Sequence, residues 1–230
     1  MAEQKNLTPS PIKQGRDSSF SDFLKKYNKT ISAIGVLLLL GVGGWFGYQY
    51  FYQNPREAKA QEAIFRAQSY FSKDSFSLAL NGDGQNFGFL KVINRYGGTK
   101  AANLSHYYAG ACYIKLGNNA KAIEMLKKFS TNSPFVQANA YKLLGDASSE
   151  TGKNKEALEY YKKAANHVEE DAICSAEYLF MAAYLADQVM KDNKEAITLY
   201  KQILSKYPTS SRSDDAQKYL ARLGEYNVDR

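Results

Sequence analysis

The feature that most constrains the fold is an internal repeat in the C-terminal half of the chain. Two stretches, YAGACYIKLGNNAKAIEMLKKF (108–129) and LLGDASSETGKNKEALEYYKKA (143–164), align without a gap at an offset of 35 residues. A third stretch, MAAYLADQVMKDNKEAITLYKQILSKYP (181–208), follows the same pattern after an insertion of about one residue before DNKEA. Self-similarity at this period indicates a solenoid of stacked supersecondary units.

The matched positions describe a helix hairpin. Small residues let its two helices approach closely: Gly110, Gly145 and Ala183 in the first helix, and Ala122, Ala157 and Ala196 in the second. Gly117 and Gly152 supply the left-handed residue that ends the first helix and opens the turn. Large side chains, Leu126, Tyr161 and Tyr200, are expected to fill the layer between repeats. One hairpin cannot bury its own faces, so neighbouring hairpins must stack.

This pattern resembles the tetratricopeptide repeat (TPR), a helix hairpin of about 34 residues. The small, glycine and alanine positions carry the resemblance, together with the closing prolines Pro134 and Pro208. It covers about residues 100–208 and implies an all-α fold, an α-solenoid of TPR helix hairpins. We expect a TPR-like domain over residues 53–230, with repeat units at about 55–99, 100–134, 135–170 and 174–208 and a capping helix at 214–223.

The first of these units is degenerate. Residues 54–72 place Ala60, Ile64, Ala67 and Phe71 on one helical face. The stretch LNGDGQNFGF (80–89) is interpreted as an enlarged turn between the two helices of this unit. In this interpretation Asn81 and Gly82 end one helix and Asn86 caps the next. As an exposed loop near the membrane, the Asn81–Gly88 segment is also a candidate contact surface.

The N-terminal part contains 22 residues without a charge, ISAIGVLLLLGVGGWFGYQYFY (31–52). As a helix they span roughly 33 Å, which matches a hydrocarbon core of about 30 Å. The alternative is a cleaved signal peptide, whose apolar region is about 7–15 residues long and precedes a small-residue cleavage site. This longer run ends in bulky aromatic residues, so the sequence favours an uncleaved transmembrane helix.

The flanking residues predict how the helix is oriented. The tail, residues 1–30, places Lys25, Lys26 and Lys29 next to the apolar run. The positive-inside rule then puts the N-terminus in the cytoplasm and the TPR domain across the membrane. Residues 18–29 predict a juxtamembrane amphipathic segment on the lipid surface, or alternatively an extension of the anchor.

Gly43 and Gly47 form a small-residue pair at helical spacing within the membrane helix. Such pairs allow close helix packing, so a homodimer through this helix is one interpretation. The other is that glycine is simply common in membrane helices.

Composition limits the possible chemistry. Residues 53–230 carry 24 Lys/Arg and 20 Asp/Glu, and no basic run interleaved with aromatic residues predicts a nucleic-acid face. Two Cys and two His leave little material for metal sites, and Cys112 and Cys174 are expected to be unpaired because they lie in different repeats. An EF-hand that began at Asn81 would need Glu where Val92 stands. We therefore expect no cofactor, no small-molecule substrate and no enzymatic activity; an enzyme on a helical scaffold is the alternative.

The TPR resemblance implies a protein-binding groove along the first helix of each hairpin. Its inner positions correspond to Tyr107, Ala111, Ile114, Lys115, Asn139, Lys142, Asp146, Ser149, Glu150, Glu177, Phe180, Tyr184, Asp187 and Gln188. TPR domains that clamp a terminal carboxylate use Lys and Asn here, and Ala111 and Asp146 depart from that pattern. The mixed lining suits another protein's surface or an extended segment, while a solvated face without a ligand is the alternative.

The whole architecture resembles bacterial inner-membrane TPR proteins that accompany the SecYEG translocon and hand emerging chains to periplasmic chaperones. The resemblance implies a single-pass scaffold without catalysis, whose partners are the translocon, a periplasmic chaperone or the emerging chain, together with membrane lipids. The alternative is a periplasmic TPR factor that coordinates outer-membrane assembly or cell-envelope division. That alternative requires cleavage near residue 50.

Overall fold

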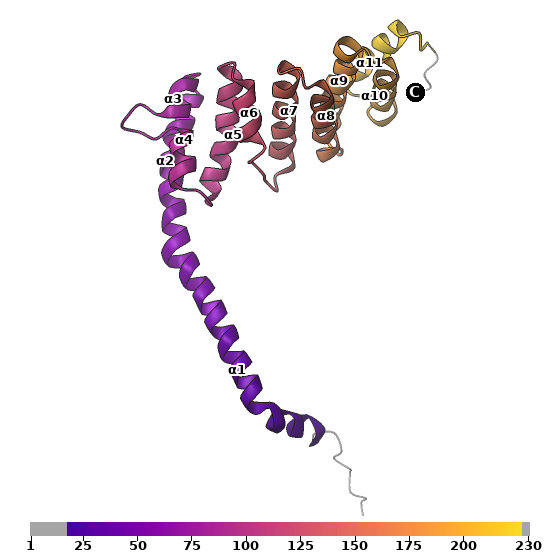
Figure 1. The fold of residues 1–230 in the computed structure, drawn as a ribbon. Helices are drawn as coiled ribbons and strands as arrows, with labels where there is room; N and C mark the ends of the chain where they lie inside the picture. Colours follow the sequence, from indigo (N-terminus) through magenta and orange to yellow (C-terminus); the bar gives the residue numbers. More distant parts are fainter. Residues whose placement is uncertain (1–17, 227–230) are drawn as a thin grey trace, which may run out of the picture. The chain divides into compact units, whose positions relative to one another are not determined.

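The computed structural model describes the backbone of residues 18–226 and the side chains of residues 26–30 and 32–226 (Figure 1). The chain divides into two units, Met1–Asn54 and Pro55–Arg230. Apart from one isolated bridge between Gly82 and Phe87, the regular elements of residues 18–226 are helices. The predicted all-α fold is therefore confirmed. Residues 1–17 of the tail and the side chains of residues 18–25 of the predicted amphipathic segment lie outside the described part, while the backbone of residues 18–29 belongs to α1.

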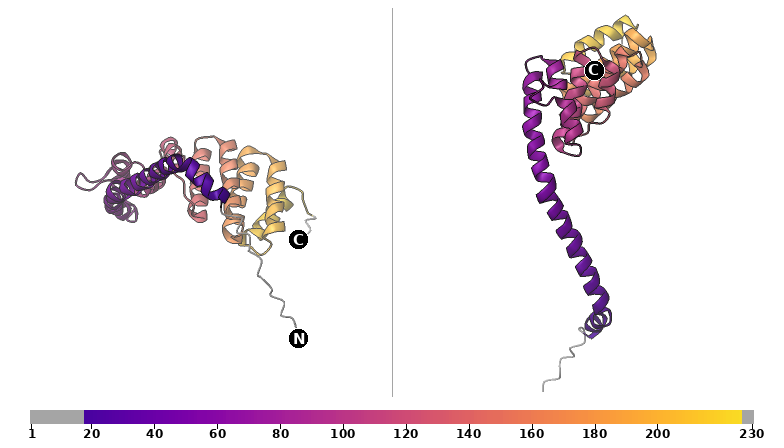
Figure 2. Two further views of the ribbon diagram at one scale, coloured as in Figure 1. Left: turned by 90° about the horizontal axis from the view of Figure 1, so that it is seen from below. Right: turned by 60° about the vertical axis from the view of Figure 1, so that its left-hand side comes forward.

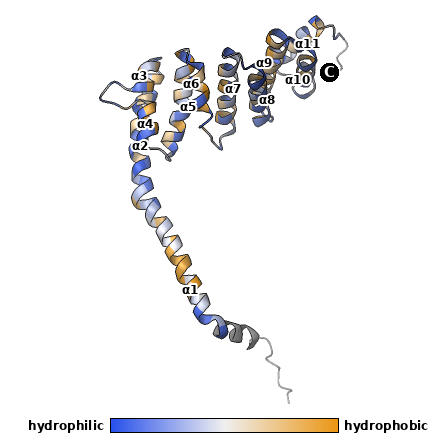
Figure 3. Ribbon diagram, in the orientation of Figure 1, coloured by the Kyte–Doolittle hydropathy of each residue, from blue (hydrophilic) through white to orange (hydrophobic). Residues whose placement is uncertain are grey.

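The first unit contains α1 (Ser18–Tyr48) and the π-helical segment η1 (Gln49–Gln53). The middle of α1 carries a hydrophobic band (Figure 3). Its side chains are open, since Leu37 is 68% and Leu39 74% exposed. Within the described residues one continuous helical stretch, Lys26–Phe71, is long and apolar enough to cross a membrane, and its apolar part has a mean hydropathy of 1.8. A membrane anchor and a signal sequence both have this character.

The second unit is a succession of helices that lie side by side from α5 onward (Figures 1 and 2). They are α2 (Asn54–Phe71), α3 (Phe76–Asn81), α4 (Phe89–Arg95), α5 (Lys100–Lys115), α6 (Asn119–Leu126), α7 (Pro134–Glu150), α8 (Asn154–His167), α9 (Ala172–Tyr184), η2 (Leu185–Met190), α10 (Asn193–Lys206) and α11 (Ser211–Arg222). Short turns join α5 to α6, α7 to α8 and η2 to α10, as the hairpin pattern predicts.

Close helix contacts explain the small residues of the repeat. A Cβ atom added to Gly110 would lie 2.5 Å from Cγ of Leu126. A Cβ atom added to Gly145 would lie 2.5 Å from Cε1 of Tyr161. Leu126 and Tyr161 thus fill the space that a side chain at the facing glycine would need. The predicted close approach of the two helices at these glycines is confirmed. Leu126 and Tyr161, which were expected between repeats, face the glycines of their own hairpins.

The turns share one geometry, a left-handed residue two positions before the second helix. Gly117 has φ 76° and Gly152 has φ 74°, as predicted. In the other two units the same position is taken by Asp74 (φ 55°) and Lys191 (φ 56°). Five residues after each of the four follows a fully buried alanine: Ala79, Ala122, Ala157 and Ala196. The first unit therefore follows the same register as the others.

This register corrects the interpretation of LNGDGQNFGF. The turn of the first hairpin is residues 72–75, and the glycine-rich loop 82–88 instead separates α3 from α4. The N-cap of α4 is Gly88, so the prediction that Asn86 caps this helix was wrong. Sequence reasoning looked for glycine at the turn, whereas aspartate also tolerates the left-handed conformation.

The insertion in the third copy of the repeat appears in the structure as the π-helical segment η2. One residue more separates Ala183 from Lys191 than separates Gly145 from Gly152. The segment η2 between them is π-helical, and a π-helix accommodates an extra residue without breaking the helix. The repeat register is restored at α10.

Two glycines and one aspartate define the loop 82–88. A Cβ atom on Gly82 or Gly88 would collide with the opposite backbone, so the loop is closed at its neck. Asp83 accepts hydrogen bonds from the backbone amides of Gln85 (2.9 Å) and Asn86 (2.6 Å) and from the hydroxyl of Tyr70 (2.6 Å). The Tyr70 hydroxyl first, and the Asn86 groups next, hold the pKa of Asp83 well below its usual range.

The helix contact at Gly145 leads to the first prediction. We expect Gly145→Ala to lower the free energy of unfolding by about 1–3 kcal/mol, because the new methyl group must displace the Tyr161 ring. Urea unfolding of the detergent-solubilised full chain, followed by far-UV circular dichroism, measures the change. The control is Gly97→Ala, whose Cβ atom would have an ordinary contact at 3.5 Å. An equal effect of both variants would contradict the packing argument.

The loop leads to the second prediction. Asp83→Ala should speed amide hydrogen exchange at Gln85 and Asn86, because both amides lose their acceptor. The pKa of Asp83 is lower in the folded protein than in an unfolded chain, where aspartate titrates near about 3.9. The stabilisation is therefore complete above about pH 5. It declines as the pH falls below the unfolded value and is lost once the pH has fallen through the lower folded value. Loss of protection near pH 5 in the unsubstituted protein would contradict this assignment.

Candidate functional site

The predicted groove residues of α5 and α7 form two sets of polar contacts. The Asn139 amide donates to the Tyr107 hydroxyl at 2.9 Å, and burial raises the pKa of Tyr107. On the next turn of α7, the Lys142 ammonium lies 2.6 Å from the Asp146 carboxylate. The Tyr161 hydroxyl donates to the same carboxylate at 2.9 Å. These polar groups are already paired, so they shape the groove more than they offer free charges to a ligand.

The remaining predicted residues differ in exposure. Lys115 and Glu150 are exposed, while Ala111, Ile114 and Gln188 are half-buried. Asp187 departs from the prediction, because it is only 4% exposed. Its carboxylate accepts a hydrogen bond from Nη2 of Arg222 at 3.0 Å. Asp187 therefore ties η2 to α11 and does not line an open surface.

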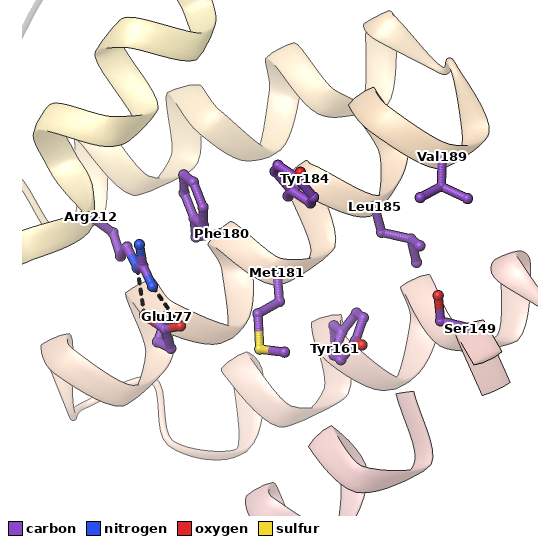
Figure 4. Close-up of a pocket in the computed structure, with 9 residues that line it drawn as sticks. All are labelled: Ser149, Tyr161, Glu177, Phe180, Met181, Tyr184, Leu185, Val189 and Arg212. Atoms are coloured by element: carbon purple, nitrogen blue, oxygen red, sulfur yellow. Dashed lines mark hydrogen bonds and ion pairs between the residues drawn. The ribbon is translucent and has the colours of Figure 1, made fainter. Parts of the chain in front are cut away.

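A pocket of about 340 Å³ is formed by residues of α7, α8, α9, η2 and α11 (Figure 4). It is lined by Ser149, Tyr161, Glu177, Phe180, Met181, Tyr184, Leu185, Val189 and Arg212. Four of these, Ser149, Glu177, Phe180 and Tyr184, belong to the predicted groove. The others come from α8, η2, α11 and a neighbouring position of α9, which the pattern of inner TPR positions does not include.

The charged residues at one edge of this pocket pair with one another. The Arg212 guanidinium donates to Glu177 at 2.5 and 2.8 Å and to Asp215 at 2.9 Å. It also lies 4.6 Å from the centre of the Phe180 ring. The hydrogen bonds that Arg212 donates to Glu177 and then to Asp215 raise its pKa although partial burial opposes them, so the group stays cationic. Figure 4 shows this ion pair at one end of the pocket.

The rest of the pocket is neutral and largely apolar. Burial and the neighbouring Asp146 raise the pKa of Tyr161, so its hydroxyl remains protonated at physiological pH. Tyr184 is 44% and Val189 51% exposed, and both contribute open apolar surface. An uncharged side chain such as leucine, methionine or phenylalanine fits this chemistry better than an ionised group.

The cysteines and histidines show no sign of a shared site. Cys112 and Cys174 are both free thiols, and burial raises the pKa of Cys112 to about 12. His106 is half-buried, and burial lowers its pKa. His167 is exposed and packs edge-on against Tyr141. In the described part of the chain, no three His, Cys, Asp or Glu residues gather as metal ligands would.

In the first unit, the surface around Gly43 and Gly47 is open. A Cβ atom added at either position would meet nothing within 4 Å. Close packing of a second helix at this pair stays a prediction.

Comparison with known proteins agrees with the repeat register. A tetratricopeptide repeat family model matches residues 105–135 and 177–210, and a second one matches residues 138–166. Curated proteins gave no match.

Among solved structures, one described as the crystal structure of MamA is similar, with a TM-score of 0.53 and 20% sequence identity over 70% of this chain and 85% of that chain. A second, of MamA protein, has a TM-score of 0.52 and 21% identity over 73% of this chain and 91% of that chain. At this identity the likeness concerns the fold alone. The stretches that the family models match, residues 105–135, 138–166 and 177–210, are tetratricopeptide repeats, which form scaffolds for protein–protein interactions.

Proposed function

We propose that this chain is a non-enzymatic, membrane-anchored scaffold that holds a segment of another protein against the pocket beside α9. The observation that carries the proposal is the apolar pocket of about 340 Å³ with open surface at Tyr184 and Val189. Isolated exposed apolar residues are common, but a concave apolar site with a few fixed polar groups favours a ligand. Because Arg212 is already paired with Glu177 and Asp215, an uncharged side chain of the partner suits the pocket better than a carboxylate.

The proposed anchor is the apolar segment 31–52 within α1. The exposure of Leu37, Leu39 and Phe46 supports it, because no other part of the described protein covers these side chains. The lysine-bearing tail supports a cytoplasmic N-terminus, with the TPR-like domain in the periplasm. The domain limits given by the sequence, 1–30, 31–52 and 53–230, belong to this proposal.

In this arrangement, we propose that the scaffold assists the protein translocation channel or passes emerging chains to a periplasmic chaperone. An emerging chain is extended and exposes apolar side chains, which matches a neutral, apolar pocket on a repeat surface. The internal pairing of Lys142 with Asp146 supports this choice over a clamp for terminal carboxylates. The translocon, the chaperone and the emerging chain remain the proposed partners.

In-membrane photo-crosslinking tests the pocket. A photoreactive phenylalanine analogue at Tyr184 should yield several-fold more protein adducts than one at Lys163, an exposed residue of α8 outside the pocket. Val189→Glu should reduce the adducts from position 184, because it places a charge at the apolar rim. Mass spectrometry identifies the partners. Recovery of only lipids and abundant bystanders from position 184 would exclude the proposed role.

The intact mass of the membrane-extracted protein tests the anchor separately. Retention of residues 31–52 is the expected result. A mass that corresponds to cleavage near residue 50 would instead favour a periplasmic TPR factor in outer-membrane assembly or envelope division.

A further inference from the structure

The first hairpin differs from the others in how its charges are used. The ion pairs found in the described residues join partners between Glu124 and Glu225, for example Lys162 with Glu195 and Arg212 with Glu177. The first hairpin carries five exposed cations that take part in none of these pairs. Lys73 lies in its turn, and the other four are Lys59, Arg66, Lys91 and Arg95. These ion pairs of the described residues thus lie in the later repeats, and these four cations of the first hairpin have no acidic partner among them.

Two of these cations line a pocket. Lys59 and Arg66 lie seven residues apart on α2, two turns along the same face. With Glu62, Ala63, Tyr96 and the loop residues Gln85, Asn86 and Phe87 they surround a space of about 300 Å³. Glu62 forms no ion pair with either cation in the described structure, so both cations remain free to bind an anion.

The other two cations gather on an aromatic ring of the loop. The Lys91 ammonium lies 4.3 Å from the centre of the Phe87 ring, and the Arg95 guanidinium lies 5.6 Å from it. They are one turn apart on α4. The Phe87 ring, which lines the pocket with the two cations of α2, therefore also contacts the two cations of α4. Counting Glu62 and Asp83 against the four cations, this surface has a net charge of +2.

The loop 82–88 is not helical, but hydrogen bonds fix its conformation. Asp83 binds the amides of Gln85 and Asn86 on one side and the Tyr70 hydroxyl of α2 on the other. Phe87 forms the bridge that closes the loop against Gly82. The insertion that separates α3 from α4 is therefore an ordered structure that presents Phe87, Gln85 and Asn86 to the pocket.

We propose that this surface, formed by Lys59, Arg66, Lys91, Arg95 and Phe87, binds the headgroup of an anionic phospholipid. Charge complementarity identifies the phosphate, and the side-chain amide of Gln85 supplies a neutral hydrogen-bonding group at the pocket. The chain itself favours a lipid, because α2 begins at Asn54, two residues after the apolar segment ends at Tyr52. The headgroup layer is the anionic surface that this hairpin meets at the highest local concentration.

The inference rests on the proposed anchor, so the test separates the two. The full chain is reconstituted into vesicles of phosphatidylcholine alone and into vesicles that also contain phosphatidylglycerol. Flotation with both vesicles reports the anchor. Hydrogen–deuterium exchange over residues 82–96 reports the headgroup site. We expect exchange of this segment to slow by about tenfold only when phosphatidylglycerol is present, and to recover as salt screens the contact.

A charge-matched pair of variants gives the decisive comparison. The quadruple variant Lys59→Gln, Arg66→Gln, Lys91→Gln and Arg95→Gln should lose the lipid-dependent slowing yet still float. The control replaces Lys153, Lys155, Lys194 and Lys218 by Gln, four exposed lysines of the later helices that take part in none of the ion pairs. It should retain the slowing.

Three outcomes decide the matter. Equal exchange in both vesicle types, with normal flotation, would overturn the headgroup site and leave the anchor intact. Equal loss in both quadruple variants would also overturn it, since net charge alone would then explain the effect. Failure to float with either vesicle would remove the anchor and, with it, the headgroup proposal.

Discussion

The structure depends on one contact, the close approach of two helices at a glycine that faces a large side chain. In the central hairpin Gly145 leaves the space that the Tyr161 ring fills, and Gly110 does the same for Leu126 one repeat earlier. Because a Cβ atom cannot fit between them, the contact fixes both the separation and the register of α7 and α8. Tyr161 then reaches Asp146 with its hydroxyl and lines the pocket beside α9. The packing rule of the repeat thus also builds the candidate site.

Both candidate binding surfaces lie where the repeat is interrupted. The π-helical segment η2 takes up one extra residue and contributes Leu185 and Val189 to the apolar pocket. The loop 82–88 interrupts the second helix of the first hairpin and contributes Phe87 to the cationic surface. A regular solenoid repeats the same surface with each unit. Insertions that leave the left-handed turn and the buried alanine in register can change one local surface while the stack continues.

The sequence predicts the regular part of this protein well, because repetition makes the packing rules visible. Gly110, Gly145, Gly117 and Gly152 were assigned their packing or turn positions from spacing alone. The first hairpin was misread because its turn uses Asp74, and one aspartate among many polar residues carries little signal. The pocket was found only in part, since Arg212 and Val189 enter it through the capping helix and the π-helix. Neither tertiary contact repeats with the period of the sequence.

The two surfaces belong to different ends of one solenoid, and this has an energetic consequence. In a stack where each hairpin contacts only its neighbours, the effect of a local change fades with the number of intervening repeats. The cationic surface is built on α2 and α4, whereas the apolar pocket is built chiefly on α8, α9 and η2. The core residues also form two clusters, one from Ala60 to Ala147 and one from Ala157 to Leu220. The proposed contact with lipid at one end could therefore hold the scaffold in place without altering the pocket that we propose for the partner at the other.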